Sequence, residues 1–99
     1  MILNVTKAEY VGDYKVVLQF DNGERKIVDL KDTIFNDRRA IFEPLRKKDF
    51  FRDFQLKFNT ITWKNEADFA PEFLYELGHS FRQLEEIVNK EISEKSAND

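Results

Sequence analysis

The chain has 99 residues, of which 41% are hydrophobic, and this is the size of one small domain with its own core. It contains no cysteine, which excludes disulfides, thiolate metal sites and cysteine nucleophiles and is typical of a reducing compartment. The net charge is −3, but residues 1–65 carry 13 basic and 10 acidic side chains, whereas residues 66–99 carry 3 and 9.

This charge asymmetry has two interpretations. The simpler one is a solvated acidic helix near the C-terminus, and the other is self-association or a basic partner for the tail. The chain opens without the basic and apolar regions of a signal peptide, and no apolar run approaches the roughly 20 residues that span a bilayer. We therefore expect a cytoplasmic protein with no membrane contact.

The first third of the chain predicts three antiparallel strands. Residues 2–10 are rich in β-branched and apolar side chains and predict a first strand, which a turn at Gly12-Asp13 follows. Residues 14–20 show the period of two that is typical of a half-buried strand. Residues 24–30 predict the returning strand of a hairpin, because Asp21-Asn22-Gly23 before them is a strong hairpin signal.

The register of this hairpin depends on the length of its loop. A two-residue Asn-Gly loop places Val16 opposite Asp29, whereas a three-residue loop with Gly23 in the left-handed conformation places Val16 opposite Val28. The longer loop also sets Lys15 opposite Asp29, so it matches apolar side chains on one face and opposite charges on the other. We therefore predict the three-residue loop, with a β-bulge at Gly23.

The middle of the chain predicts a short helix between the two hairpins. Residues 31–40 are polar and predict an irregular connection with room for one helical turn. Residues 41–48 predict a short helix with Pro44 in its first turn. Residues 54–58 alternate again and predict another strand.

A second hairpin is predicted at Asn59-Thr60. A turn there reverses the chain, so that Phe58 faces Ile61 and Leu56 faces Trp63. This hairpin ends at the only tryptophan of the chain, for which we expect a structural role.

After Trp63 the hydrophobic period changes from two to about 3.6, which predicts a helix. Asp68 or a nearby residue is expected to cap this helix, Pro71 to open it, and Glu72 to lie in the first turn, where the helix dipole favours an anion. The apolar stripe of this helix comprises Phe73, Leu74 and Leu77, which are expected to face the core.

Gly78 is expected to stop or kink this helix. From His79 onward the spacing of three and four predicts that the helix resumes to about Ile92, before a frayed end. Together the elements predict an α+β fold: a small antiparallel sheet built from two hairpins plus an N-terminal strand, with short helices and a C-terminal amphipathic helix.

Six short motifs follow one another along roughly residues 1–77. They are Phe20-Asp21-Asn22-Gly23, Val28-Asp29-Leu30, Phe42 with Leu45, Ile61-Thr62-Trp63, Ala67-Asp68, and Pro71-Glu72 with Leu74-Tyr75. In this order the motifs resemble a small bacterial family, the domain of unknown function 2442.

The resemblance implies a compact α+β domain without a settled catalytic activity. It also implies a protein partner, because members are often encoded beside a second small protein that looks like a ribonuclease-toxin relative. Some members carry a fused helix-turn-helix, and none follows residue 77 here. Glu66 stands where a glycine is common in the family. We divide the chain into an α+β domain, 1–77, and a C-terminal acidic helix with a frayed tail, 78–99.

Side chains that suggest catalysis or metal binding are few. His79 is the only histidine and has no ligand-spaced motif around it, so an exposed or helix-junction histidine is the better interpretation. Ser80 lacks a nucleophile elbow, and three glycines do not provide a phosphate-binding loop. Four carboxylates lie among lysines and arginines and are better interpreted as solvated charge than as an acid/base pair: Asp32, Asp37, Asp49 and Asp53. We expect no enzyme, no cofactor, no metal and no small-molecule substrate.

The middle segment has a composition that can bind nucleic acid. Its basic residues interleave with Phe42, Phe50 and Phe51, and such residues neutralise phosphates and stack on bases. The pI of about 5.2 and the fitness of these phenylalanines for the core make core packing the better interpretation. The same patch could also dock the acidic tail of another chain. The candidate basic patch is Arg38, Arg39, Arg46, Lys47, Lys48 and Arg52.

The C-terminal helix raises the question of what covers its apolar stripe, Phe81, Leu84, Val88 and Ile92. Packing back on the sheet is the simplest expectation, and a homodimer or a partner's groove are the alternatives. The exposed edge of the sheet is a second candidate contact surface, through strand addition.

These patterns lead to one main functional hypothesis. We predict a non-catalytic protein-interaction module, the antitoxin-like or regulatory partner of a small neighbouring-gene protein. The alternative is a regulator that contacts nucleic acid through residues 38–52, and a small-molecule sensor with a pocket between sheet and helices is weaker still. Structural roles are expected for Gly23, Trp63, Asp68 and Pro71.

Overall fold

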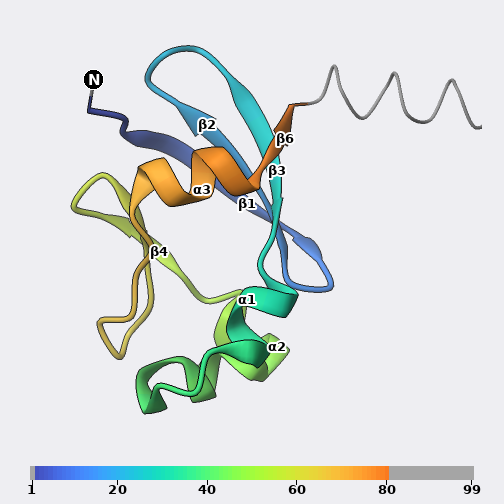
Figure 1. The fold of residues 1–99 in the computed structure, drawn as a ribbon. Coiled ribbons are helices and arrows are strands. Elements are labelled where there is room, and N and C mark those ends of the chain that lie inside the picture. The colour runs from blue at the N-terminus through green and yellow to red at the C-terminus, as the bar shows by residue number, and fades with distance from the viewer. Residues whose placement is uncertain (1, 81–99) are drawn as a thin grey trace, which may run out of the picture.

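The computed structural model describes residues 2–80 and shows an α+β domain (Figure 1). The strands of this range form two antiparallel sheets, one with the order β1-β2-β3-β6 and one made of β4 and β5. The predicted fold class is therefore confirmed, although the second hairpin forms a sheet of its own. The elements are β1 (Val5–Gly12), β2 (Lys15–Phe20), β3 (Arg25–Asp29), α1 (Lys31–Asn36), the 3₁₀-helix η1 (Ala40–Arg46), α2 (Lys48–Phe51), β4 (Gln55–Lys57), β5 (Thr60–Thr62), α3 (Pro71–Leu77) and β6 (His79–Ser80).

The β2–β3 hairpin has the predicted register. Lys15 lies opposite Asp29, and Val16 lies opposite Val28. Gly23 has a φ of 88°, the left-handed conformation that glycine adopts without a steric penalty. The three-residue loop is thus confirmed, and it directs one face of the hairpin into the core. The buried residues of this face are Val16, Leu18, Phe20 and Val28.

The β4–β5 hairpin turns one residue earlier than predicted. Leu56 lies opposite Ile61 instead of Trp63, so the loop consists of Phe58 and Asn59. Both loop residues have positive φ, 54° and 65°, as a type I′ turn requires. The predicted register is wrong because the alternating pattern assigned Phe58 to the strand, whereas the turn uses it as a loop residue.

The helical segment after β3 consists of three short pieces. Residues 31–36 form α1, within the segment predicted as a connection. The helix predicted over residues 41–48 is instead η1, which ends at Arg46, and α2 begins separately at Lys48. Pro44 lies inside η1, where its missing N–H and its ring are incompatible with a regular α-helix.

The helix α3 begins as predicted but lacks the predicted cap. Pro71 occupies its first turn, whereas the N-cap residue is Ala70 and no side chain caps the helix. Asp68 instead forms an isolated β-bridge with Thr62 of β5. The Asp68 cap is therefore a wrong prediction, because the backbone of this residue continues the pairing of the strand upstream of the helix.

Gly78 ends α3, and the chain then forms a strand. The N–H of Gly78 donates to the carbonyl of Leu74 at 3.0 Å. A Cβ on Gly78 would lie 3.0 Å from a methyl group of Val28, so glycine allows the chain to pass close to β3. His79 and Ser80 pair with β3 as β6. The helix predicted from His79 is therefore wrong for these two residues, whose backbone bonds to the sheet.

An aromatic cluster forms the centre of the core. The rings of Trp63 and Phe51 lie 5.5 Å apart, and the indole Nε1 donates to the buried carbonyl of Phe51 at 2.7 Å. Tyr14 packs edge-on against Phe51 at 5.3 Å, and its hydroxyl donates to the carbonyl of Arg46. These contacts attach the β4–β5 hairpin and the four-stranded sheet to α2, and they explain the structural role predicted for Trp63.

The turn that follows β5 repeats the hydrogen bonds of the β2–β3 loop. That loop is closed by bonds from the N–H groups of Phe20 and Gly23, 2.8 and 3.0 Å long. The equivalent bonds from Trp63 and Glu66 are both 2.9 Å long. Glu66 thus occupies the position that Gly23 occupies in the first loop, and its φ is 69°. The turn has the same closed geometry even though a glutamate stands where the first loop has a glycine.

Candidate protein-binding groove

Three phenylalanines from different segments form a stack that reaches the surface. Phe42 of η1 lies 5.1 Å from Phe69, and Phe69 lies 5.7 Å from Phe73 of α3, between ring centroids and with 19° between the planes. Phe42 and Phe69 are buried, whereas Phe73 is 41% exposed. The prediction that Phe73 faces the core is therefore wrong, because its ring stacks at the open end of this row.

The stack lines a groove of about 430 Å³ between η1 and the segment that leads into α3. Ile41, which is 40% exposed, adds a second accessible apolar side chain. The size is within the roughly 300–1,000 Å³ of sites that enclose small ligands or single side chains. The polar side chains of the groove are Thr33, Asp37, Arg39, Glu66 and Asp68.

The rim of the groove is acidic. Its cation, Arg39, is bound to Asp37, with Nη2 2.6 Å from Oδ2 and Nε 3.0 Å from Oδ1. The side-chain bonds from Arg39, together with a bond from its backbone N–H, lower the pKa of Asp37 from 3.8 to about 2. Glu66 and Asp68 are exposed. The carboxylates thus outnumber the cations, which favours a ligand that carries positive charge.

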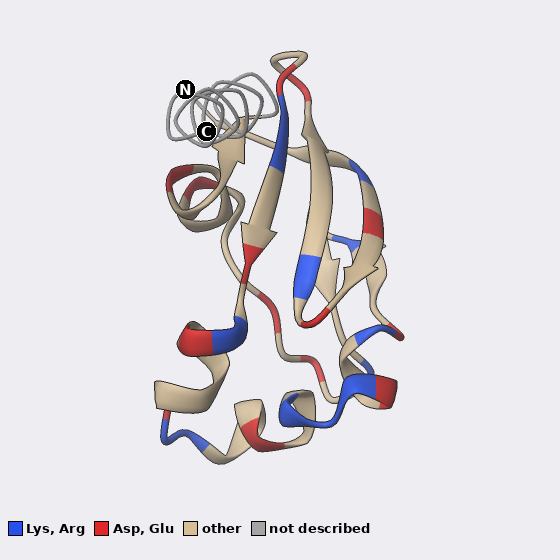
Figure 2. Ribbon diagram, turned by 90° about the vertical axis from the view of Figure 1, so that its right-hand side faces the viewer, with Lys and Arg blue, Asp and Glu red and all other residues tan. Residues whose placement is uncertain are grey.

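The members of the predicted basic patch are not all exposed. Arg46 turns inward, where its Nη2 donates to the carbonyl of Asp37 at 3.2 Å and its guanidinium lies 5.9 Å from the ring of Phe35. Arg52 lies 3.9 Å from Asp49. Basic and acidic positions alternate along this end of the molecule (Figure 2). The exposed members of the patch are Arg38, Arg39, Lys47, Lys48 and Arg52.

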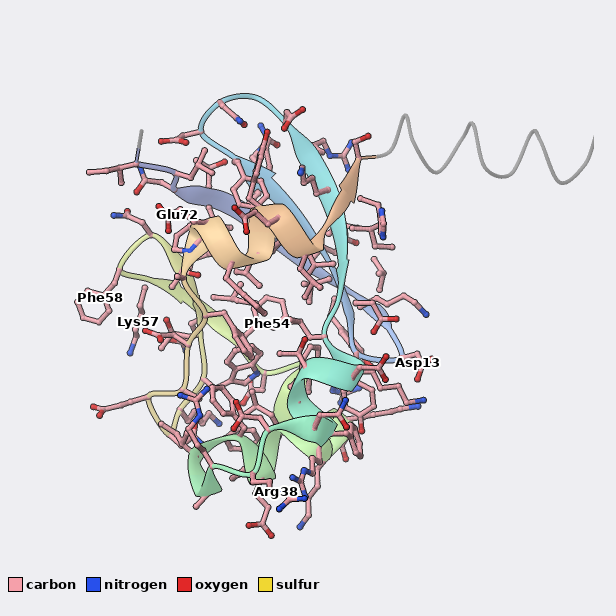
Figure 3. All side chains as sticks on the ribbon, viewed as in Figure 1. Asp13, Arg38, Phe54, Lys57, Phe58 and Glu72 are labelled. Carbon is pink, nitrogen blue, oxygen red and sulfur yellow. The ribbon has the colours of Figure 1, made fainter. Side chains whose placement is uncertain are left out.

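A different basic cluster surrounds Asp13 at the β1–β2 turn. The ammonium groups of Lys15, Lys31 and Lys48 each lie 3.7 Å from a carboxylate oxygen of Asp13. The predicted patch included only Lys48, because Lys15 of β2 and Lys31 of α1 lie outside residues 38–52 and are brought to Asp13 by the fold. Asp13 lies at the opposite side of the molecule from the β4–β5 tip (Figure 3).

Comparison with protein families decides the classification. The family described as "Protein of unknown function (DUF2442)" matches residues 5–80, from the start of β1 to the end of β6. The chain belongs to this family. No curated protein and no solved structure matches it.

The sequence of this DUF2442 member also drew attention to His79 and to a C-terminal apolar stripe. His79 is exposed on β6, and residues 2–80 contain no group of three or more side chains suited to hold a metal ion. No helix in the same range is long and apolar enough to cross a membrane. The C-terminal stripe, Phe81, Leu84, Val88 and Ile92, lies outside the described residues.

Sequence reasoning missed the groove for a physical reason. Its walls come from two segments, around Phe42 and around Phe69, and no sequence pattern shows that these distant segments meet. One structural peculiarity at this place is Glu66, a non-glycine residue with a left-handed backbone. Glu66 lies on the rim of the groove.

Proposed function

We propose that this protein is a non-catalytic interaction module that binds a partner protein in the groove between η1 and α3. The occupant is a loop or helix that presents an apolar side chain flanked by a basic one. The partner we propose is the small protein encoded by the neighbouring gene. Binding in the groove would regulate this partner in the way that an antitoxin regulates its toxin. A reducing cytoplasm suits a chain without cysteine.

One observation carries the proposal: accessible apolar side chains lie inside an acidic rim. Phe73 and Ile41 remain 41% and 40% exposed while the stack beneath them is buried. Apolar surface that lies in a hollow and is rimmed by charge is typical of binding sites. The acidic rim selects a basic partner and disfavours an acidic one.

Co-expression with the neighbouring-gene product tests this function. Phe73→Ser is expected to abolish co-purification, because it removes the accessible end of the stack. Phe35→Ser is the matched control, since Phe35 is 45% exposed on α1 and packs on Tyr14, outside the groove. Co-purification that is lost in the first variant and kept in the second supports the proposal, and equal co-purification in both contradicts it.

The paired substitution Leu84→Asp and Val88→Asp tests the predicted C-terminal contact separately. Retained association in this double variant would remove the C-terminal stripe from the binding surface and leave the groove as the site. Loss of association here, together with retention in Phe73→Ser, would assign binding to the stripe instead.

A second candidate function, contact with nucleic acid, is favoured by the cluster around Asp13. Three ammonium groups facing one carboxylate leave a local positive charge that can neutralise phosphates. A gel shift that weakens with salt, and that disappears when Lys15, Lys31 and Lys48 are changed to alanine, is the expected result. If the protein does not bind nucleic acid at low ionic strength, with or without the partner, this alternative is contradicted.

A further inference from the structure

The tip of the β4–β5 hairpin presents an exposed phenylalanine. Phe58 is 87% exposed, and its side chain projects away from the body of the molecule (Figure 3). It is the first of the two loop residues, and its φ is 54°. Its neighbour Lys57 is exposed at the end of β4.

Neither the positive φ of Phe58 nor the exposure of its ring helps the isolated chain to fold. A bulky residue in the left-handed region is strained, and type I′ turns prefer asparagine, aspartate or glycine at this position. An 87% exposed ring also gains little from burial within its own chain. Strain at an exposed aromatic side chain points to a contact outside the chain.

The hairpin tip and the groove have complementary chemistry. The tip offers an aromatic ring next to the ammonium group of Lys57, whereas the groove offers stacked rings within a rim that carries Glu66 and Asp68. A groove of about 430 Å³ is large enough to receive a benzyl group. The basic and apolar occupant described above is thus present on the surface of this same chain.

We propose that the Lys57-Phe58 tip of one copy inserts into the groove of a second copy. The tip of the β4–β5 hairpin and the turn around residue 66 both lie along the left side of the molecule in Figure 1. Two copies related by a two-fold axis therefore exchange tips reciprocally, which closes the assembly at a dimer. The inference rests on the proposed function because it uses the same groove, and it makes self-association and partner binding mutually exclusive.

Sedimentation equilibrium of the full chain tests the dimer. The wild type is expected to show a monomer–dimer equilibrium. Phe58→Asn is expected to weaken it by more than about 30-fold, the effect of losing one interface hot spot, because a reciprocal dimer contains two copies of this contact. Asparagine suits the turn better than phenylalanine, so at low protein concentration, where both proteins are monomeric, this variant should unfold at the same or a higher temperature than the wild type. A weakened dimer in a well-folded variant therefore reports on the contact itself. Phe35→Asn is the matched control and should leave the dimer unchanged.

A charge exchange tests the register of the contact. Lys57→Glu and Glu66→Lys are each expected to weaken the dimer several-fold, and the double variant is expected to recover most of the loss, because the pair is restored with its signs reversed. A wild type that stays monomeric at all concentrations overturns the inference, as does a dimer that Phe58→Asn leaves unchanged. A monomer whose partner binding is still abolished by Phe73→Ser would refute the dimer and leave the proposed function standing.

Discussion

Replacement of Glu66 by glycine is expected to stabilise the fold. The turn at residue 66 has the same closing hydrogen bonds as the β2–β3 loop, in which Gly23 occupies the left-handed position. Glu66 is exposed, so the substitution removes backbone strain with little loss of packing. The two loops therefore allow opposite substitutions to be compared in one molecule: Glu66→Gly removes the strain from one loop, and Gly23→Ala introduces it into the other.

The magnitude follows from two opposing terms. A non-glycine residue in the left-handed conformation costs about 1–2 kcal/mol, whereas the greater freedom of glycine in the unfolded chain costs about 0.4–1 kcal/mol. The net gain for Glu66→Gly is therefore roughly 0.5–1 kcal/mol, and Gly23→Ala should lose a similar amount. A Cβ at Gly23 would have no atom within 4 Å, so this loss contains no steric clash.

Chemical denaturation of wild type, Glu66→Gly, Glu66→Ala and Gly23→Ala measures these differences. A change of roughly 0.5–1 kcal/mol corresponds to about 2–8 °C in Tm for a domain of this size. The protein concentration must be kept low, so that self-association does not add to the apparent stability. Glu66→Ala retains the strain and should resemble the wild type. If the glycine and alanine variants at position 66 are equally stable, the charge of the glutamate rather than its backbone decides the outcome, and the strain argument is refuted.

Three further substitutions test the packing and the electrostatics. Gly78→Ala should destabilise by about 1–3 kcal/mol, because its Cβ would crowd Val28 at 3.0 Å, and urea unfolding should show a lower midpoint. Trp63→Phe should destabilise by at least about 1–3 kcal/mol, since it leaves the buried carbonyl of Phe51 without its donor, and a smaller change would indicate that another group takes over. Asp37 has a pKa of about 2 in the folded protein, below its usual 3.8, so its contribution to stability is present above about pH 4 and is lost as the pH falls toward 2. Asp37→Asn should therefore be less stable than the wild type at pH 7, and acid titrations of the two proteins should converge near pH 2.

The first hairpin could be predicted from sequence because its signals are local. Alternation, the Asp-Asn-Gly loop and the charge pair between Lys15 and Asp29 all select the same register. The second hairpin could not be predicted in the same way. Its strands have three residues each, and the alternating pattern continues through Phe58 into the loop. The pattern therefore predicts the turn one residue too late, at Asn59-Thr60 instead of Phe58-Asn59.

The candidate site depends on contacts between distant segments. Asp68 has the residue type of a helix cap, but it lies two residues before the N-cap, Ala70, and its backbone forms an isolated bridge with Thr62. Phe73 fits the helical period of a core residue, yet its ring stacks at the open end of the groove. Sequence periodicity identifies which side chains are apolar, whereas the tertiary arrangement determines which of them stay accessible.

Positive φ has different meanings at Tyr14, Phe58 and Glu66. Tyr14 has a φ of 63°, but its ring is buried and packs edge-on against Phe51, so contacts within the chain offset its strain. Phe58 and Glu66 have the same kind of backbone without such burial, and asparagine or glycine would form either turn at a lower cost. Both residues belong to the proposed contact between copies, one on the tip and one on the groove. Phe58→Asn and Glu66→Gly should therefore raise the stability of the monomer and weaken the dimer. If either substitution stabilises both the monomer and the dimer, the backbone strain at that residue is not linked to the contact between copies.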